Sequence, residues 1–145
     1  MTAALLTAAL AFACPVTKPN DRPLPGLYGN GRLAAPTYYP AITVSRRNVQ
    51  RNGWIGEKFP WRAYGVRGEL TITGRRLDRR APALRARVNP GFPVEEKVDA
   101  FWAVGILFPT PGCWQITGSV GSATLTFVTR VVDPQGLARQ RQVRP

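Results

Sequence analysis

The chain has 145 residues and a formal net charge of +12, because 20 Lys and Arg side chains outnumber 8 Asp and Glu side chains. It contains no histidine, the commonest general base and metal ligand. Its two cysteines cannot by themselves complete a four-ligand zinc site. These counts argue against an enzyme, a bound metal and a cofactor.

The chain is long enough for one domain with a substantial hydrophobic core. Its 14 Gly and 14 Pro are spread between short apolar runs, which indicates many turns joining short strands. The positive charge permits binding to nucleic acid, anionic lipid or acidic wall polymers. A genome that encodes arginine freely would give the same charge on a solvated surface with no ligand.

Residues 1–13 are uncharged and apolar, and they are too few to span a bilayer as a helix. They are typical of a signal peptide, with Ala11-Phe12-Ala13 as a small-x-small cleavage site, although no basic residue follows Met1. Cleavage there would leave Cys14 first, which also allows its acylation as a lipid anchor on the outer face of a membrane. A buried N-terminal helix is the third interpretation. We therefore predict a secreted or extracytoplasmic protein.

Residues 14–40 contain six prolines, which exclude a helix and any long central strand. We expect an extended arm packed along the domain, with a turn at 29–31 and a short strand at 32–35. Tyr28, Tyr38 and Tyr39 either form a sugar-binding aromatic group or cover a core edge with their hydroxyl groups in water.

Residues 41–132 contain the stretches that we expect to form the sheets. Apolar and polar residues alternate, or apolar runs occur, at 41–46, 70–73, 83–89, 101–108, 113–117 and 122–132. We expect the last two to form a hairpin around a turn at 118–121, preceded by a Pro-Gly corner. Four residues of this hairpin would anchor one sheet of the core: Trp114, Ile116, Leu125 and Phe127.

Aromatic and basic residues mix in the stretch KFPWR at 58–62. It is either a stacking platform for bases or sugars or an aromatic plug that closes one end of the core. With the arginines that follow, it suggests a polyanion-binding face, of which nucleic acid is the least favoured ligand. The candidate residues are Trp61, Arg62, Arg75, Arg76, Arg79, Arg80, Arg85 and Arg87.

The remaining segments carry no clear chemistry. Residues 94–99 hold most of the local acid and are expected to form a solvated loop after a turn at 89–91, and residues 133–145 are expected to form a basic flexible tail. Glu57, Glu69 and Asp78 are the carboxylates available for a hydrolase, but no nucleophile–base pair accompanies them.

Cys14 and Cys113 have only each other as partners within the chain. In an oxidising compartment an even cysteine count suggests a disulfide. The loop it closes would be about 100 residues long, which the chain-entropy account values at about 4 to 5 kcal/mol. Strand alternation places Cys113 opposite Trp114 and Ile116, so the bridge would join the arm to an outer face or end of the domain. Acylation of Cys14 is the competing hypothesis.

Several motifs together resemble a group of uncharacterised secreted or lipoprotein-like bacterial proteins. They are CPVTKPN from residue 14, GNG from 29, KFPW from 58, GVRGELTITGRRLD from 65, FPTPGCW from 108 and LTFVTRVV from 125. The resemblance implies an immunoglobulin-like domain in which both cysteines belong to the pattern, and it implies no activity. The chain departs from the pattern in its short start, in the shortened stretch around 47–56 and in its basic tail.

We therefore expect a single immunoglobulin-like antiparallel β-sandwich of about seven strands at 41–132, with the proline-rich arm packed on it. The expected function is non-enzymatic, a binding or structural role at the cell envelope with an unidentified protein or envelope polymer as partner. Polyanion binding is the alternative, and a hydrolase is the least favoured.

Overall fold

The computed structural model describes residues 11–89 and 100–143, and β-strands account for all but one of the regular elements there. Most of the expected signal peptide, the end of the turn at 89–91 and the acidic loop at 94–99 lie outside the described residues. The expectation of an all-β protein is confirmed. The strands are β1 (Leu27–Gly29), β2 (Leu33–Pro36), β3 (Ile42–Thr43), β4 (Ile55–Lys58), β5 (Trp61–Ala63), β6 (Thr71–Arg76), β7 (Arg85–Val88), β8 (Ala100–Trp102), β9 (Val104–Phe108), β10 (Gly112–Val120) and β11 (Ala123–Val132), and helix α1 (Leu137–Val143) follows them.

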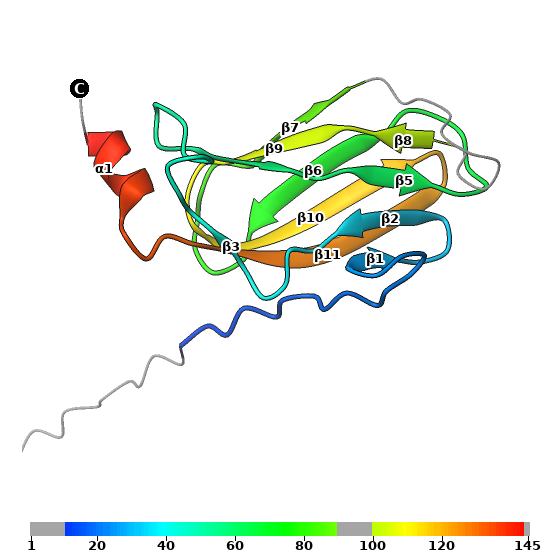
Figure 1. The fold of residues 1–145 in the computed structure, drawn as a ribbon, viewed down its shortest axis with the longest axis horizontal. Helices are drawn as coiled ribbons and strands as arrows, with labels where there is room; N and C mark the ends of the chain where they lie inside the picture. Colours follow the sequence, from blue (N-terminus) through cyan, green and yellow to red (C-terminus); the bar gives the residue numbers. More distant parts are fainter. Residues whose placement is uncertain (1–10, 90–99, 144–145) are drawn as a thin grey trace, which may run out of the picture.

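The strands form three hydrogen-bonded sheets, with the orders β1-β2-β5-β8, β3-β11-β10-β6 and β4-β9-β7 (Figure 1). Two of these sheets are continuous in register. Ile55 pairs with Phe108 in one and Trp61 pairs with Trp102 in the other, and no residue is inserted between them on either side. The amide of Phe59 donates to the carbonyl of Val104 between the two ladders, so β4 and β5 run alongside β9 and β8 as one antiparallel pair. We call the combined surface layer one and the sheet β3-β11-β10-β6 layer two.

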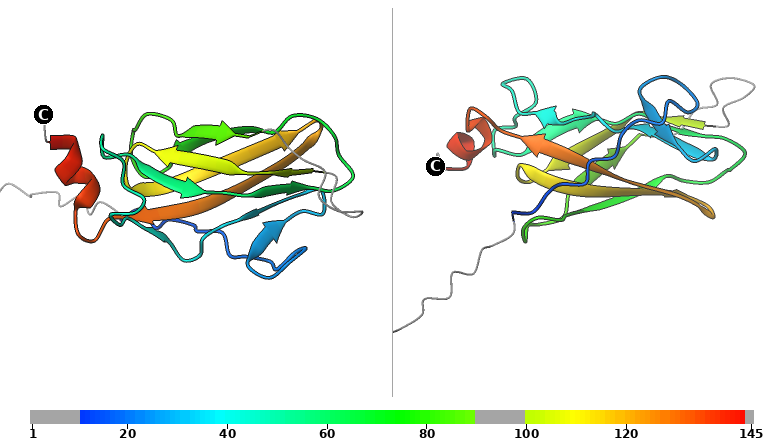
Figure 2. Two further views of the ribbon diagram at one scale, coloured as in Figure 1. Left: turned by 45° about the horizontal axis from the view of Figure 1, so that its top comes forward. Right: turned by 90° about the horizontal axis from the view of Figure 1, so that it is seen from below.

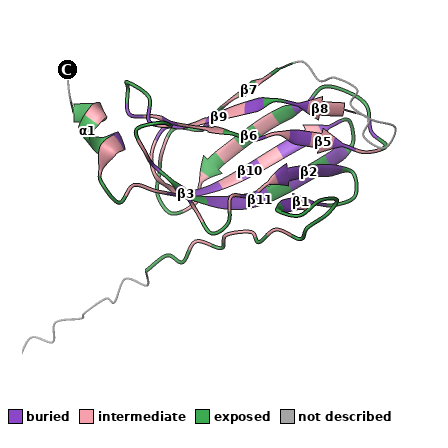
Figure 3. Cartoon of the chain, in the orientation of Figure 1, coloured by how far each residue is buried: buried purple, intermediate pink, exposed green. Residues whose placement is uncertain are grey.

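Layers one and two face each other across the core (Figure 2). Aromatic rings join them, because Phe59 and Trp61 of layer one contact Phe127 of layer two at centroid distances of 6.2 and 5.8 Å. The burial of apolar side chains between the two layers is the main favourable contribution to the stability of the fold. The four expected anchor residues, Trp114, Ile116, Leu125 and Phe127, all lie in this buried interior (Figure 3).

The described residues contain eleven strands, rather than the expected number of about seven. One cause is Pro60, which has no amide to donate and separates β4 from β5. Ala103 likewise separates β8 from β9. The arm contributes β1 in addition to the short strand expected at 32–35. The antiparallel hairpin of β10 and β11 is present, but Gly118 lies within β10 and the turn is confined to Gly121 and Ser122.

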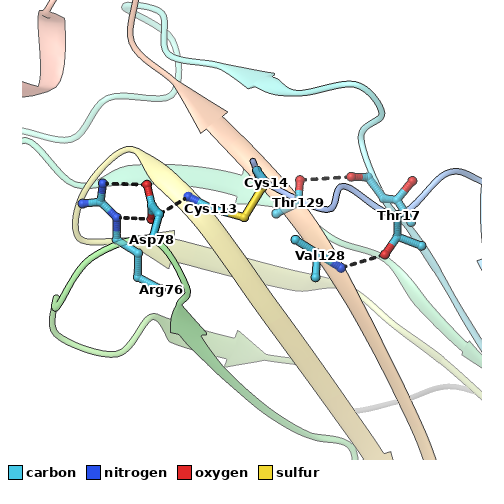
Figure 4. The surroundings of a disulfide bond; sticks show 8 residues. Cys14, Thr17, Arg76, Asp78, Cys113, Val128 and Thr129 are labelled. Atoms are coloured by element: carbon cyan, nitrogen blue, oxygen red, sulfur yellow. Dashed lines mark hydrogen bonds and ion pairs between the residues drawn. A yellow bond between two sulfur atoms is a disulfide. The ribbon is translucent and has the colours of Figure 1, made fainter. Parts of the chain in front are cut away.

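The arm is joined to layer two by a disulfide and by hydrogen bonds, of which Figure 4 shows the disulfide, the Thr17–Val128 contact and a bond from the Thr129 hydroxyl to the carbonyl of Thr37. Cys14 forms a disulfide with Cys113 of β10, which confirms the expected bridge. Thr17 donates its amide to the carbonyl of Val128 at 2.9 Å, and its hydroxyl oxygen accepts the amide of Val128 at 2.9 Å. Asn30 donates to the carbonyl of Thr124 at 2.8 Å. These contacts satisfy part of the edge of β11 that its short parallel partner β3 leaves open.

The segment expected as a flexible tail instead contains helix α1. Asp133 accepts the amides of Leu137 and Ala138 at 2.9 and 3.0 Å, which caps the helix start. Ala138 is fully buried, and Gln142 donates to the carbonyl of Pro109 at 3.1 Å. A helix of seven residues with one buried side chain has no apolar periodicity, so the sequence pattern did not reveal it. None of the helices in the described ranges is long and apolar enough to cross a membrane.

Candidate functional site: the basic face of layer one

Of the two interpretations of 58–62, the stacking platform is excluded, because its aromatic residues are not on the surface. Phe59 and Trp61 are both 0% exposed, because their side chains point from layer one into the core. Trp61 must therefore be removed from the predicted polyanion-binding residues. The aromatic residues of this stretch contribute to the core, and Lys58, Pro60 and Arg62 alternate with them on the outer side.

The four arginines at 75–80 lie around the end of β6 and the loop that follows it. Arg76 forms an ion pair of 2.8 Å with Asp78, the one ion pair found among the described residues. Its side-chain hydrogen bond holds the pKa of the Asp78 carboxyl below its usual value, and Asp78 also accepts the amide of Cys113. Arg75 donates to Gln115 of layer two, and Arg79 and Arg80 are exposed. These residues therefore support the β10 corner or extend into solvent away from the outer side of layer one.

Arg62, Arg85 and Arg87 all lie on the outer side of layer one, with Arg62 nearer the opposite end of the sheet. The guanidinium carbon of Arg62 is 5.4 Å from the centre of the Phe101 ring, and that of Arg85 is 4.8 Å from the Trp54 ring. Both contacts have the geometry of cation–π pairs, and each guanidinium covers one face of its ring. These cations were predicted to share one face with those at 75–80, whereas the fold places the latter on layer two and the loop that follows β6.

Two further residues complete this surface, Lys58 and Gly105. Lys58 pairs in register with Gly105 of β9, and Arg87 pairs with Gly105 from the other side. We call the surface formed by Lys58, Arg62, Arg85, Arg87 and Gly105 the basic face. None of its cations has an ion-pair partner among the residues that the structure describes.

Two adjoining hollows lie on the basic face, of about 610 and 510 Å³, and both are lined by Lys58, Arg87 and Gly105. The larger hollow adds polar groups from the segment between β3 and β4 and from Glu57. The smaller one adds apolar groups from Pro60 and Phe101. Together they form a shallow surface with cations at the centre and mixed polar and apolar groups around them.

Gly105 keeps the centre of this surface open. A Cβ atom added there would meet nothing within 4 Å, and its φ is outside the left-handed region that favours glycine. Neither backbone geometry nor packing therefore requires glycine at this position. A glycine inside a strand costs roughly 0.5–1 kcal/mol relative to alanine, so its effect here is to leave room above the strand.

Tyr38 fixes the backbone beneath Lys58. Its hydroxyl donates to the Lys58 carbonyl, and its ring packs edge-on against Phe59 at 4.9 Å. Burial, with a smaller contribution from the charge of Glu57, raises the pKa of Tyr38 to about 12. Tyr28 and Tyr38 pack against the core, as expected of residues that cover a core edge, and the Tyr38 hydroxyl also binds the backbone of β4. Tyr39 is exposed beneath Lys18, 5.8 Å from the ring centre.

The carboxylates considered for a hydrolase do not meet. Glu57, Glu69 and Asp78 line three different hollows, so no two of them face one bound molecule there. In residues 11–89 and 100–143, no cluster of three or more His, Cys, Asp or Glu could hold a metal ion.

The basic face was missed in part because β4 was not predicted. Charged and aromatic residues alternate from 58 to 62 on both sides of Pro60. Read as one strand, this alternation places Lys58 and Arg62 outward and Phe59 and Trp61 inward. Nothing in the sequence indicated that Gly105 lies between two cations.

No protein-family model, no curated protein and no solved structure matches this chain. Its function is therefore inferred from its own residues.

Proposed function

We propose that the chain folds as an immunoglobulin-like β-sandwich and acts as a non-enzymatic module that binds an anionic partner outside the cytoplasm. The strand orders support the first part. With the continuous pairs counted as single strands, layer one reads β2, β4 with β5, β8 with β9, and β7. Lettered A to G in chain order with β6 as C, these strands follow the spatial order A-B-E-D of an immunoglobulin domain, and β6, β10 and β11 follow its C-F-G order, with β1 and β3 as additional edge strands.

The disulfide supports a location outside the cytoplasm, because such bonds persist in oxidising compartments. The same bond removes the support for a lipid anchor at Cys14. Its sulfur is bonded to Cys113 and has no free valence for an acyl-bearing thioether. A membrane partner through Cys14 is therefore not part of the proposal.

The observation that carries the binding proposal is the basic face. Four cations project from the two strands that flank β8 and β9 in layer one, without an acidic partner in the described part of the chain. The four cations flank the strand formed by β8 and β9, and a bound polyanion would offset their mutual repulsion across it. Because two of these guanidinium groups also cover aromatic rings, the surface is ordered before a ligand arrives.

The test is binding of the oxidised protein to labelled polyanions across a series of NaCl concentrations. Association releases counterions, so the logarithm of the affinity should fall linearly as the logarithm of the salt concentration rises. An uncharged dextran of matched length is the control and should not bind. Absence of binding to every polyanion at low salt, or an affinity that salt leaves unchanged, would refute the proposal.

A further inference from the structure

The strand register of layer one places two cations on opposite sides of Gly105, a residue without a side chain. Lys58 of β4 and Arg87 of β7 are each directly opposite Gly105 of the strand between them. Two inter-strand spacings separate their backbones, about 10 Å. Long flexible side chains at that separation can both reach an anion placed above Gly105, and the hollows on either side leave space for the rest of a ligand.

We propose that this position binds an acidic polysaccharide, with a sugar carboxylate above Gly105 held between the Lys58 ammonium and the Arg87 guanidinium. The inference rests on the proposed function and assigns it a position and a ligand class. A carboxylate suits this pair because a guanidinium can donate two parallel hydrogen bonds to it while the ammonium supplies a point charge.

The groups around the two cations favour a sugar chain. The larger hollow is lined by Ser45, Asn48, Gln50 and Glu57, whose hydroxyl, amide and carboxylate groups suit sugar hydroxyls that both donate and accept. Arg47 also lines it and offers a further cation to the acidic groups of the sugar chain. The smaller hollow offers Pro60, Phe101 and Ala103, which suit the apolar C–H face of a sugar ring. A polymer with a short charge spacing and no hydroxyl groups would use few of these contacts.

Nucleic acid fits the same surface less well. Sequence-tolerant binding of single strands depends on aromatic rings open to successive bases. Phe59 and Trp61 are buried, and a guanidinium covers one face of Phe101. Glu57 in the larger hollow would also repel a closely spaced phosphate chain. Single-stranded DNA and polyphosphate are therefore the competitors in the test.

The test measures binding of labelled polygalacturonate oligosaccharides to the oxidised protein at low salt. Gly105→Tyr fills the space between the cations without removing a charge. Lys58→Gln/Arg87→Gln removes both charges and leaves the space. Each variant should weaken binding about tenfold or more, as expected when charge-assisted hydrogen bonds are lost. Arg79→Gln/Arg80→Gln makes the same change in net charge away from the basic face, and its affinity should change less than about threefold.

The outcomes separate this inference from the proposed function. If no polyanion binds the unmodified protein, the proposed function fails and this inference fails with it. If polygalacturonate binds with equal affinity to all three variants, or if DNA or polyphosphate of matched charge binds more tightly, only the inference fails. Thermal unfolding of each variant establishes that it is folded, and Gly105→Val replaces Gly105→Tyr if the tyrosine variant is not.

Discussion

Two glycines in the middle of strands show how much the surroundings decide the role of one residue. Gly118 of β10 and Gly105 of β9 both lack the positive φ that would require glycine. A Cβ at Gly118 would lie 2.4 Å from the indole of Trp61, whereas a Cβ at Gly105 would meet nothing within 4 Å. Gly118 is thus required by the packing of a buried tryptophan, and Gly105 is not required by the fold.

We predict that alanine substitution at these two positions has different effects on stability. Gly118→Ala should lower the free energy of unfolding by about 1–3 kcal/mol, because the added methyl forces the indole or the strand to move. Gly105→Ala should leave it unchanged or raise it by up to about 1 kcal/mol, because alanine restricts the unfolded chain and meets no clash. Urea unfolding of the two variants measures the difference. Equal stabilities would mean that Trp61 does not pack on β10 as described.

At the scale of elements, one covalent bond and a few hydrogen bonds attach the first part of the arm to layer two. The disulfide joins residues 99 positions apart, and Thr17 then pairs with Val128 along the edge of β11. Without the bridge, only these few partly exposed hydrogen bonds and limited apolar contact would hold the first part of the arm. Segments of that kind open at low free-energy cost.

We therefore predict that Cys14→Ser/Cys113→Ser unfolds the arm locally as well as lowering global stability. The free energy of unfolding should fall by about 2–5 kcal/mol. Amide exchange of Val128 should accelerate more than that of Ile116, whose amide lies in the centre of the hairpin. Thr17→Val keeps the bridge and removes the hydroxyl acceptor of the Val128 amide. It therefore measures how much of the faster exchange at Val128 comes from losing that hydrogen bond alone. Equal acceleration at the two amides would show that the bridge acts only through global stability.

The elements that sequence reasoning predicted are those with a long regular pattern. The β10–β11 hairpin alternates over many residues, and its position followed directly from that period. Strands β4 and β5 were not predicted, because they are short and Pro60 interrupts them. Lys58 and Arg87 lie on either side of Gly105 because of the register between strands that are far apart in the chain. That register could not be predicted from this single sequence. The candidate site was therefore predicted only as a group of seven arginines, four of which lie outside the basic face.

The charge of the whole molecule has a consequence for stability that is separate from any ligand. A net charge of +12 on a small fold produces self-repulsion in the compact state. Only one ion pair offsets it among the described residues. Added salt screens this repulsion, since the Debye length falls from about 30 Å at 0.01 M to about 8 Å at 0.15 M.

We predict that NaCl affects stability and polyanion binding in opposite directions. The Tm of the free protein should rise by a few degrees between about 0.01 and 0.15 M NaCl, because screening relieves the folded state more than the expanded one. The affinity for a polyanion should fall over the same range, because releasing the same number of counterions gains less entropy when the bulk salt concentration is higher. Calorimetry of the free protein and of Arg79→Gln/Arg80→Gln checks the first effect, and the variant should show the smaller rise since its net charge is lower by two. A Tm that stays constant or falls with salt would mean that the arginines are compensated by acidic groups, and the basic face would then lose the electrostatic basis for its proposed role.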